Sequence, residues 1–170
     1  MAINIYCEFI YIILDYHSIL EKKEKQFEIC IPILIGIASF IYTIFINNIQ
    51  YQFINSIISF IGILLGFTLA ALTLLLSNER IEQKTLKYQM ERKIRGKTVS
   101  LYKMLVINYS YLIIIETFLC IIYYVTLLFQ NLTSGIYNDV VNSIFIMLVF
   151  HVLFGTVRTI TNLYFVSAKE

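Results

Sequence analysis

The sequence has few of the residues that interrupt helices or carry enzyme chemistry. Its 170 residues include one proline, six glycines, two histidines and no tryptophan. It contains no Walker A loop, no GxGxxG, HExxH, CxxC or GxSxG motif, and no paired carboxylates. Ser110 and His151 fall at different depths of their apolar runs, which argues against an intramembrane Ser–His hydrolase. We therefore expect a protein that is not an enzyme and that uses no metal or cofactor.

Disulfide and secretory signals are missing as well. The three cysteines, Cys7, Cys30 and Cys120, are odd in number and scattered through apolar sequence, which argues against a disulfide framework or a metal site. We expect them to behave as small apolar residues. Residues 1–20 lack a basic start and a small-residue cleavage site, so we expect them to belong to the mature chain rather than to a signal peptide.

Apolar residues, by contrast, are unusually abundant. They make up 59% of the chain, and the mean hydropathy is +0.77, whereas soluble domains are about 45–50% apolar. Four runs reach the length of about 20 residues that a bilayer requires, at about 29–46, 53–76, 104–129 and 140–166. The runs are long and continuous, which favours helices over the short alternating segments of a membrane barrel. The sequence therefore predicts an all-α polytopic membrane protein with four transmembrane helices.

The basic residues predict the orientation of these helices. Three lysines precede the first run, and eight Lys/Arg against three acidic residues lie between positions 79 and 103. The connections around 47–52 and 130–139 contain neither Lys nor Arg. Basic flanks stay on the cytoplasmic side of a membrane. We therefore expect both termini and the basic segment, residues 77–103, to be cytoplasmic.

Two regions flank or interrupt the membrane helices. Residues 1–28 predict an amphipathic helix with an acidic polar face, which either lies in the plane of the membrane interface, packs on the basic segment, or is a lead-in with no specific role. Residues 29–170 form the transmembrane domain. The basic segment has no proline, and good helix formers extend to Arg95, so we expect the second membrane helix to continue into the cytoplasm. Gly96 would then close that helix.

The second run carries small residues at steps of three and four, which places them on one helix face. This pattern lets helix backbones approach closely in lipid, and it serves packing within the chain, between subunits or around a pore axis. The first run has a shorter counterpart at Gly36 and Thr43. The small-residue stripe of the second run comprises Ser59, Gly62, Gly66, Ala70 and Thr73.

Three ionisable residues fall inside the third and fourth runs: Glu116, His151 and Arg158. Such residues are costly in hydrocarbon and mark functional sites by default. We expect Glu116 to pair with Arg158 or His151, within one chain or between neighbouring copies. The pair would act as a structural clamp or in conduction or sensing, unless Arg158 merely extends to the interface.

The basic segment is the largest predicted soluble surface. Its charge suits anionic lipids, an acidic protein partner, or a phosphate-bearing ligand such as a nucleotide or oligonucleotide, or else it only sets the topology. The candidate docking residues are Lys84, Lys87, Arg92, Lys93, Arg95 and Lys97.

The run from Gly66 to Ser77, GFTLAALTLLLS, is followed at once by charged sequence. With the four-span plan, it resembles small membrane proteins of bacterial anti-phage defence systems, such as the membrane subunit of Kiwa-type systems and channel-forming abortive-infection effectors. The resemblance implies a homo-oligomer, such as a tetramer, in a bacterial inner membrane, which senses membrane perturbation or conducts ions and is coupled to a cytoplasmic partner. Alternatives are a holin-like or immunity protein, and a small transporter or accessory subunit, which would require broken helices.

Overall fold

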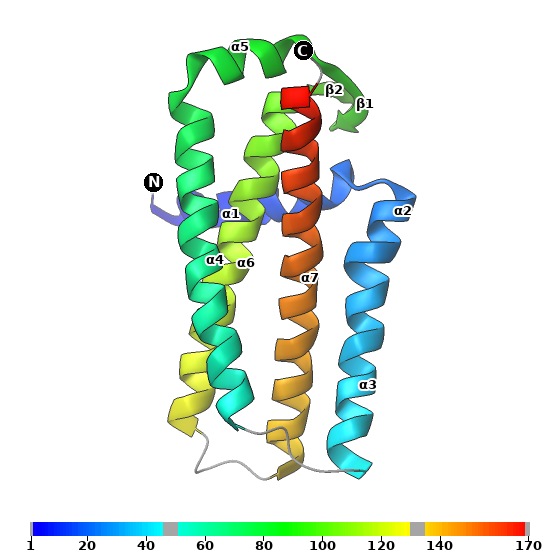
Figure 1. Ribbon diagram of the computed structural model, residues 1–170, viewed down its shortest axis with the longest axis vertical. Coiled ribbons are helices and arrows are strands. Elements are labelled where there is room, and N and C mark those ends of the chain that lie inside the picture. The colour runs from blue at the N-terminus through cyan, green and yellow to red at the C-terminus, as the bar shows by residue number, and fades with distance from the viewer. Residues whose placement is uncertain (1, 46–50, 130–134, 169–170) are drawn as a thin grey trace. The chain divides into compact units, whose positions relative to one another are not determined.

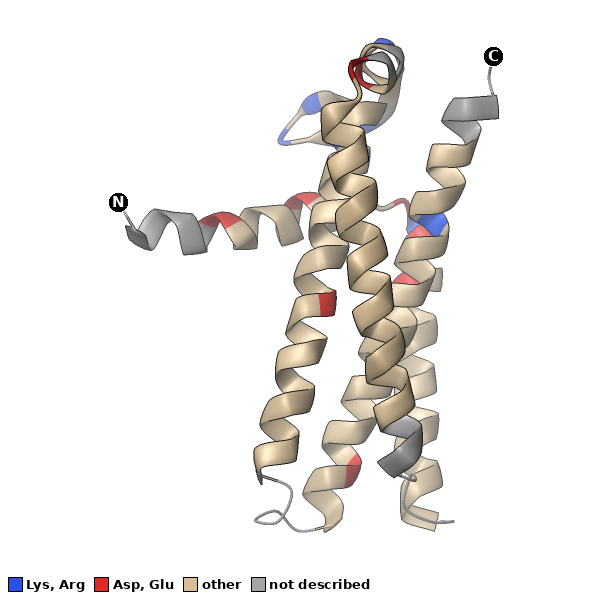
Figure 2. Cartoon of the chain, turned by 60° about the vertical axis from the view of Figure 1, so that its left-hand side comes forward, with Lys and Arg blue, Asp and Glu red and all other residues tan. Residues whose placement is uncertain are grey.

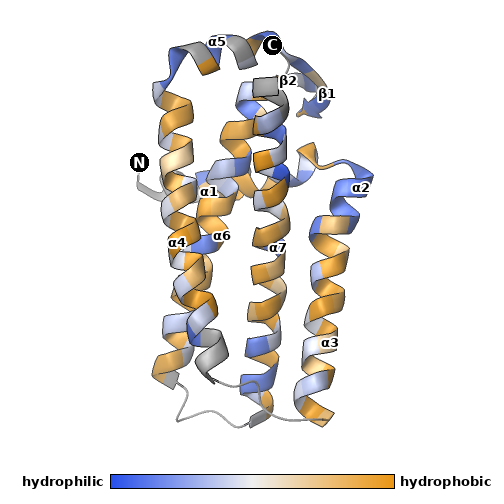
Figure 3. Ribbon diagram, viewed as in Figure 1, coloured by the Kyte–Doolittle hydropathy of each residue, from blue (hydrophilic) through white to orange (hydrophobic). Residues whose placement is uncertain are grey.

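The computed structural model describes residues 2–45, 51–129 and 135–168. Within them, four helices are long and apolar enough to cross a membrane, which confirms the predicted fold class (Figures 1 and 3). A continuous helix satisfies its own backbone groups, and this is what hydrocarbon requires of a spanning segment. The candidate spans are Lys22–Phe45, Asn55–Ser77, Leu101–Leu128 and Gly135–Tyr164.

The elements follow one another with short connections. The first span is built from three consecutive helical segments, and a two-stranded sheet precedes the third span. In chain order the elements are α1 (Ala2–Ile19), α2 (Lys22–Lys25), a π-helix η1 (Gln26–Cys30), α3 (Ile31–Phe45), α4 (Tyr51–Ser77), α5 (Glu79–Lys87), β1 (Gln89–Ile94), β2 (Lys97–Ser100), α6 (Leu101–Phe129) and α7 (Gly135–Ala168).

The second membrane helix does not continue to Arg95, so that prediction was wrong. Helix α4 ends at Ser77, and the separate helix α5 begins at Glu79, directly after Asn78. The Asn78 side-chain oxygen accepts a hydrogen bond from the Ile81 amide at 3.3 Å. Asparagine is among the strongest helix N-caps, because its side chain satisfies an amide that the first turn leaves unpaired. The cap therefore starts a new helix where the sequence suggested a continuous one.

The remainder of the basic segment forms a β-hairpin instead of helix. Strands β1 and β2 pair antiparallel, with Ile94 opposite Lys97 and Lys93 opposite Thr98. Between them, Arg95 and Gly96 have φ angles of 49° and 81°. Positive φ at both central residues defines the two-residue turn that best matches strand twist. Gly96 therefore serves a hairpin turn, whereas the sequence analysis gave it the end of a helix.

The chain divides into two compact units, and α4, α6 and α7 each contribute residues to both. We call residues 1–21, 66–114 and 155–170 the hairpin unit, and residues 22–65 and 115–154 the groove unit.

The hairpin unit has a core made by α4, α6 and α1. Leu75, Leu105 and Tyr109 form a buried cluster. The helix predicted near the N-terminus is present as α1, and it runs across the other helices of this unit rather than alongside them (Figure 2). Its Tyr16 ring stacks on Tyr111 with ring centroids 3.6 Å apart. A Cβ on Gly155 would lie 3.1 Å from the Tyr16 hydroxyl, so this glycine leaves the space that the tyrosine needs.

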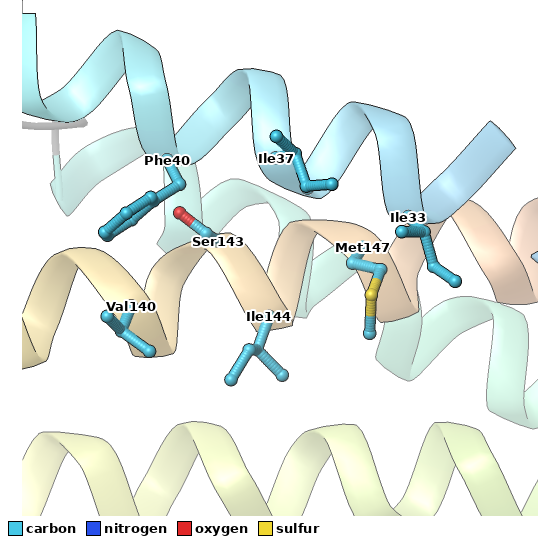
Figure 4. Close-up of a pocket in the computed structure, with 8 residues that line it drawn as sticks. Ile33, Ile37, Phe40, Val140, Ser143, Ile144 and Met147 are labelled. Atoms are coloured by element: carbon cyan, nitrogen blue, oxygen red, sulfur yellow. The ribbon is translucent and has the colours of Figure 1, made fainter. Parts of the chain in front are cut away.

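In the groove unit, α3 packs against α7 through Gly36. A Cβ added to Gly36 would lie 2.9 Å from the Met147 Cβ, which is closer than real Cβ atoms approach. Gly36 therefore allows these two helices to approach closely at this point. Beside this contact lies an apolar groove of about 270 Å³, lined by Ile33, Ile37 and Phe40 of α3 and by four residues of α7 (Figure 4).

Candidate functional site

The β-hairpin is attached to the C-terminal end of α1 through Arg92. Its guanidinium lies 3.4 Å from the Glu21 carboxylate, and a second nitrogen donates to the Ile19 carbonyl at 3.4 Å. The Arg92 side chain is 12% exposed. Carbonyls at a helix C-terminus lack intrahelical donors and carry partial negative charge. Arg92 therefore satisfies both the end of α1 and the carboxylate beside it.

A second contact joins the same two elements near the turn. Arg95 lies 3.3 Å from Asp15, and its guanidinium carbon stands 4.9 Å from the Tyr11 ring centroid. In the structure, the N-terminal helix therefore packs on the basic segment, which is one of the three roles considered for it in the sequence analysis. The side of α1 that carries Ile10 and Leu14 is exposed, at 56% and 57%, so contact with lipid is compatible with it.

The predicted docking residues consequently fall into two groups. Arg92 and Arg95 are engaged by α1, whereas Lys87, Lys93 and Lys97 are exposed. The side chain of Lys84 lies outside the described part of the chain. Figure 2 shows blue Lys and Arg positions on the β-hairpin, with others elsewhere in the chain. The exposed lysines are available to an outside partner without breaking a contact to α1.

The small-residue stripe of α4 faces away from the chain. All five of its residues are exposed, and no described atom lies within 4 Å of a Cβ built on Gly62 or Gly66. The buried side of α4 instead carries Ile61, Thr68 and Leu75, spaced by seven residues. Within the described part of the chain, neither glycine is therefore packed against another element, which leaves packing between copies as an open role of the stripe.

Arg158 of α7 has its contacts inside the hairpin unit. It donates to the Asn108 side-chain oxygen at 3.4 Å, and its guanidinium carbon lies 5.1 Å from the Tyr16 ring centroid. Asn108 and Tyr16 are both fully buried. An arginine held by an amide oxygen and an aromatic face keeps its charge solvated by protein. Arg158 is thus fixed beneath α1.

His151 contacts the backbone of the first span. Its Nδ1 is hydrogen-bonded to the Glu28 carbonyl oxygen in the groove unit. A carbonyl only accepts, so Nδ1 carries the proton. In an α-helix this carbonyl would receive the amide of residue 32, which is Pro32 and has no N–H. His151 is thus a hydrogen-bond donor to a carbonyl that the backbone of Pro32 cannot serve.

Glu116 of α6 is fully buried, as expected of a carboxyl inside a span. It belongs to the groove unit, as His151 does. The pairing of Glu116 with His151 or Arg158 stays a prediction.

The sequence analysis did not identify three residues that contact His151 or Arg158: Glu28, Asn108 and Tyr16. Glu28 precedes the first predicted span, 29–46, yet this residue is 2% exposed. A proline four residues after Glu28 was a usable signal, because it removes the amide that this carbonyl would accept from in a regular α-helix. Asn108 and Tyr16 offered no comparable pattern. Within the described ranges, no three His, Cys, Asp or Glu side chains come together as metal ligands.

These features define a multi-pass membrane protein with a helix-and-hairpin module. Searches of protein-family models, curated proteins and solved structures find no match for the chain.

Proposed function

We propose that this protein is a non-enzymatic, homo-oligomeric protein of the bacterial inner membrane that senses membrane perturbation. Its copies associate through the small-residue stripe of α4. Its termini and β-hairpin lie in the cytoplasm, where the hairpin passes the signal to a partner. The resemblance to defence membrane proteins supports a role against phage.

The observation that carries self-association is the exposure of the stripe. Only 11% of the apolar stretch of α4 is buried, which is the smallest buried share among the four candidate spans. Lipid tails pack equally well on leucine, so lipid alone gives no reason for glycine and alanine on this face. A second copy does, because small residues let two backbones approach and gain dispersion contacts.

The cytoplasmic side is assigned from charge. Lys22, Lys23 and Lys25 at the start of the first span, and the lysines of the β-hairpin, adjoin the ends of the spans that the positive-inside rule places in the cytoplasm. The cytoplasmic β-hairpin is then the surface that a soluble partner reaches.

A sensor is favoured over a pore by where the intramembrane polar groups lie. Glu116 and His151 are buried, at 0% and 9%, and Arg158 is directed onto Asn108. All three residues belong to α6 or α7. A pore formed between copies through α4 would instead be lined by the exposed face of α4. These polar groups are thus directed into the chain, and a pore around α4 would be lined by small, weakly polar side chains.

The test replaces both glycines of the stripe with leucine. Gly62→Leu combined with Gly66→Leu should convert the oligomer into monomers, measured by light scattering in detergent and by single-molecule counting in native membranes. Ala38→Leu is the matched control, because Ala38 is an exposed small residue of α3 away from the stripe. An unchanged oligomer in the double variant would contradict the proposal.

Sensor and pore are separated by expressing the chain alone with a membrane-potential dye. The proposal predicts no depolarisation without phage challenge. Depolarisation on expression alone would overturn the sensor in favour of a pore.

A further inference from the structure

A second cavity lies in the hairpin unit, between α1, the β-hairpin and the start of α6. Its volume is about 260 Å³. The buried side chains of Ile94 and Val99 contribute its apolar lining. Its polar lining consists of Asp15, Arg95, Lys97, Thr98 and Lys103. We call it the basic cavity.

The electrostatics of the basic cavity favour an anion. Three of its side chains are cationic and one is anionic, so its lining has an excess of two positive charges. Helix α6 begins beside it, with the Lys103 amide donating to the Ser100 hydroxyl at 3.4 Å. The start of a helix this long adds positive potential.

The residue types narrow the anion to a phosphate. A guanidinium binds phosphate oxygens through two parallel hydrogen bonds, ammonium groups add charge without fixing the geometry, and a hydroxyl donates one bond. Arg95, Lys97, Lys103 and Thr98 supply all three kinds of donor around one space. A carboxylate ligand would use fewer of these donors.

We propose that the basic cavity binds the phosphate of a phosphate ester, and that this phosphate takes the place of Asp15 on Arg95. The Asp15–Arg95 pair is the resident contact of the cavity. The Arg95 side chain is 63% exposed, and exposed ion pairs are weak. An anionic phosphate, whose oxygens can accept from Arg95, Thr98 and the lysines together, therefore competes well for the guanidinium.

Binding then loosens one of the two attachments of α1. Arg92 still holds Glu21, while the contact at Asp15 is given up. The ligand thus changes how α1 sits on the β-hairpin. This deepens the proposed function and rests on it in one respect, that the hairpin is the surface that passes the signal.

Two sources offer the same phosphate chemistry. Lys103 stands at the start of the third span, the level at which lipid headgroups lie, so phosphatidic acid or phosphatidylglycerol can reach the cavity. A soluble phosphate ester can reach it from the cytoplasm. The experiment therefore has a lipid arm and a soluble arm.

In the lipid arm, purified full-length protein is placed in phosphatidylcholine nanodiscs with and without phosphatidic acid or phosphatidylglycerol, and retained lipid is measured by native mass spectrometry. In the soluble arm, detergent-solubilised protein is titrated with inorganic phosphate and adenosine monophosphate. Binding in either arm supports the proposal and identifies the source. Binding in neither arm overturns it.

Variants test whether the binding occurs in the basic cavity. Each lysine near an anionic group contributes about fivefold in affinity, the equivalent of roughly 1 kcal/mol. Lys97→Gln with Lys103→Gln should therefore weaken binding by about 30-fold. Asp15→Asn should strengthen it, because the competing carboxylate is gone. Lys87→Gln removes an exposed charge of α5 outside the cavity and should change little.

Three results contradict the site: unchanged binding in the double variant, weaker binding in Asp15→Asn, or an equal loss in Lys87→Gln. Because binding is measured on purified protein, failure of the site is distinct from failure of self-association. Circular dichroism of each variant confirms that the exposed substitutions leave the helices intact.

Discussion

Replacing His151 with leucine should destabilise the groove unit by removing one hydrogen-bond donor. In a regular α-helix the Glu28 carbonyl would accept from the amide of residue 32, which is proline and has no N–H. The π-helix shifts the neighbouring bond as well, so that the Ile31 amide donates to the Gln26 carbonyl. A buried carbonyl without a donor costs about 1–3 kcal/mol. Leucine is similar in size to histidine, so little of the effect comes from a cavity.

The sharper form of this prediction is a rescue by Pro32→Ala. Alanine restores the backbone N–H that Glu28 would accept in a regular helix. Pro32 lies in the first turn of α3, where proline is tolerated, so Pro32→Ala alone should change the unfolding free energy little. In the double variant the restored amide replaces His151, and the coupling should be about 1–2 kcal/mol.

The assay is the free energy of unfolding in mixed micelles, obtained for the wild type, both single variants and the double variant. His17→Leu serves as the control, because His17 belongs to the other unit and should be additive with Pro32→Ala. If Pro32→Ala and His151→Leu are also additive, the Glu28 carbonyl is not what His151 satisfies, and the reasoning is refuted.

Three further substitutions test other contacts. Gly36→Leu should destabilise the chain by about 1–3 kcal/mol through overpacking, because a Cβ there would already lie 2.9 Å from the Met147 Cβ; thermal unfolding measures this. Arg158→Leu should cost about 1–3 kcal/mol by leaving the buried Asn108 amide oxygen without its donor, measured in the same way. Gly96→Ala should destabilise the β-hairpin by about 1 kcal/mol, since its φ is 81°; hydrogen exchange of the hairpin amides reports it.

Each of these has a control in the chain. Gly62→Leu meets no described atom within 4 Å, so the unfolding free energy of the monomer should not fall as it does for Gly36→Leu. Val157→Leu, on an exposed side chain next to Arg158, should be neutral. Lys97→Ala keeps the turn glycine and should leave hairpin exchange nearly unchanged. Equal effects in a variant and its control would contradict the corresponding contact.

The membrane helices could be predicted from sequence because length and continuous apolarity are sufficient for that purpose. The end of α4 could not be predicted from sequence in the same way. Residues 79–95 have good helix propensity, and propensity is a weak prior that local capping overrides. Asn78 and the Arg95–Gly96 turn decided the structure of this segment. The strand pattern was hidden, because the mostly buried Arg92 occupies an inward position that usually carries an apolar residue.

For the candidate site, periodicity showed which residues share a face but not where the face points. The same kind of spacing marks Gly36, which packs on Met147, and Gly62, which is exposed. A helix pattern contains no information on its neighbours. The partner of His151 is a backbone carbonyl, a group that every residue has, so only the position of Pro32 pointed to it.

The central claim, self-association through α4, is tested most directly by cysteine crosslinking in membranes. Single cysteines are placed along α4 in a chain whose three native cysteines are replaced by alanine. Disulfide-linked dimers should form at the stripe positions 59, 62, 66, 70 and 73. They should not form at Phe60, Phe67 or Leu76, which are 48%, 54% and 55% exposed but lie to either side of the stripe. Equal crosslinking on and off the stripe, or none at its five positions, would contradict the account.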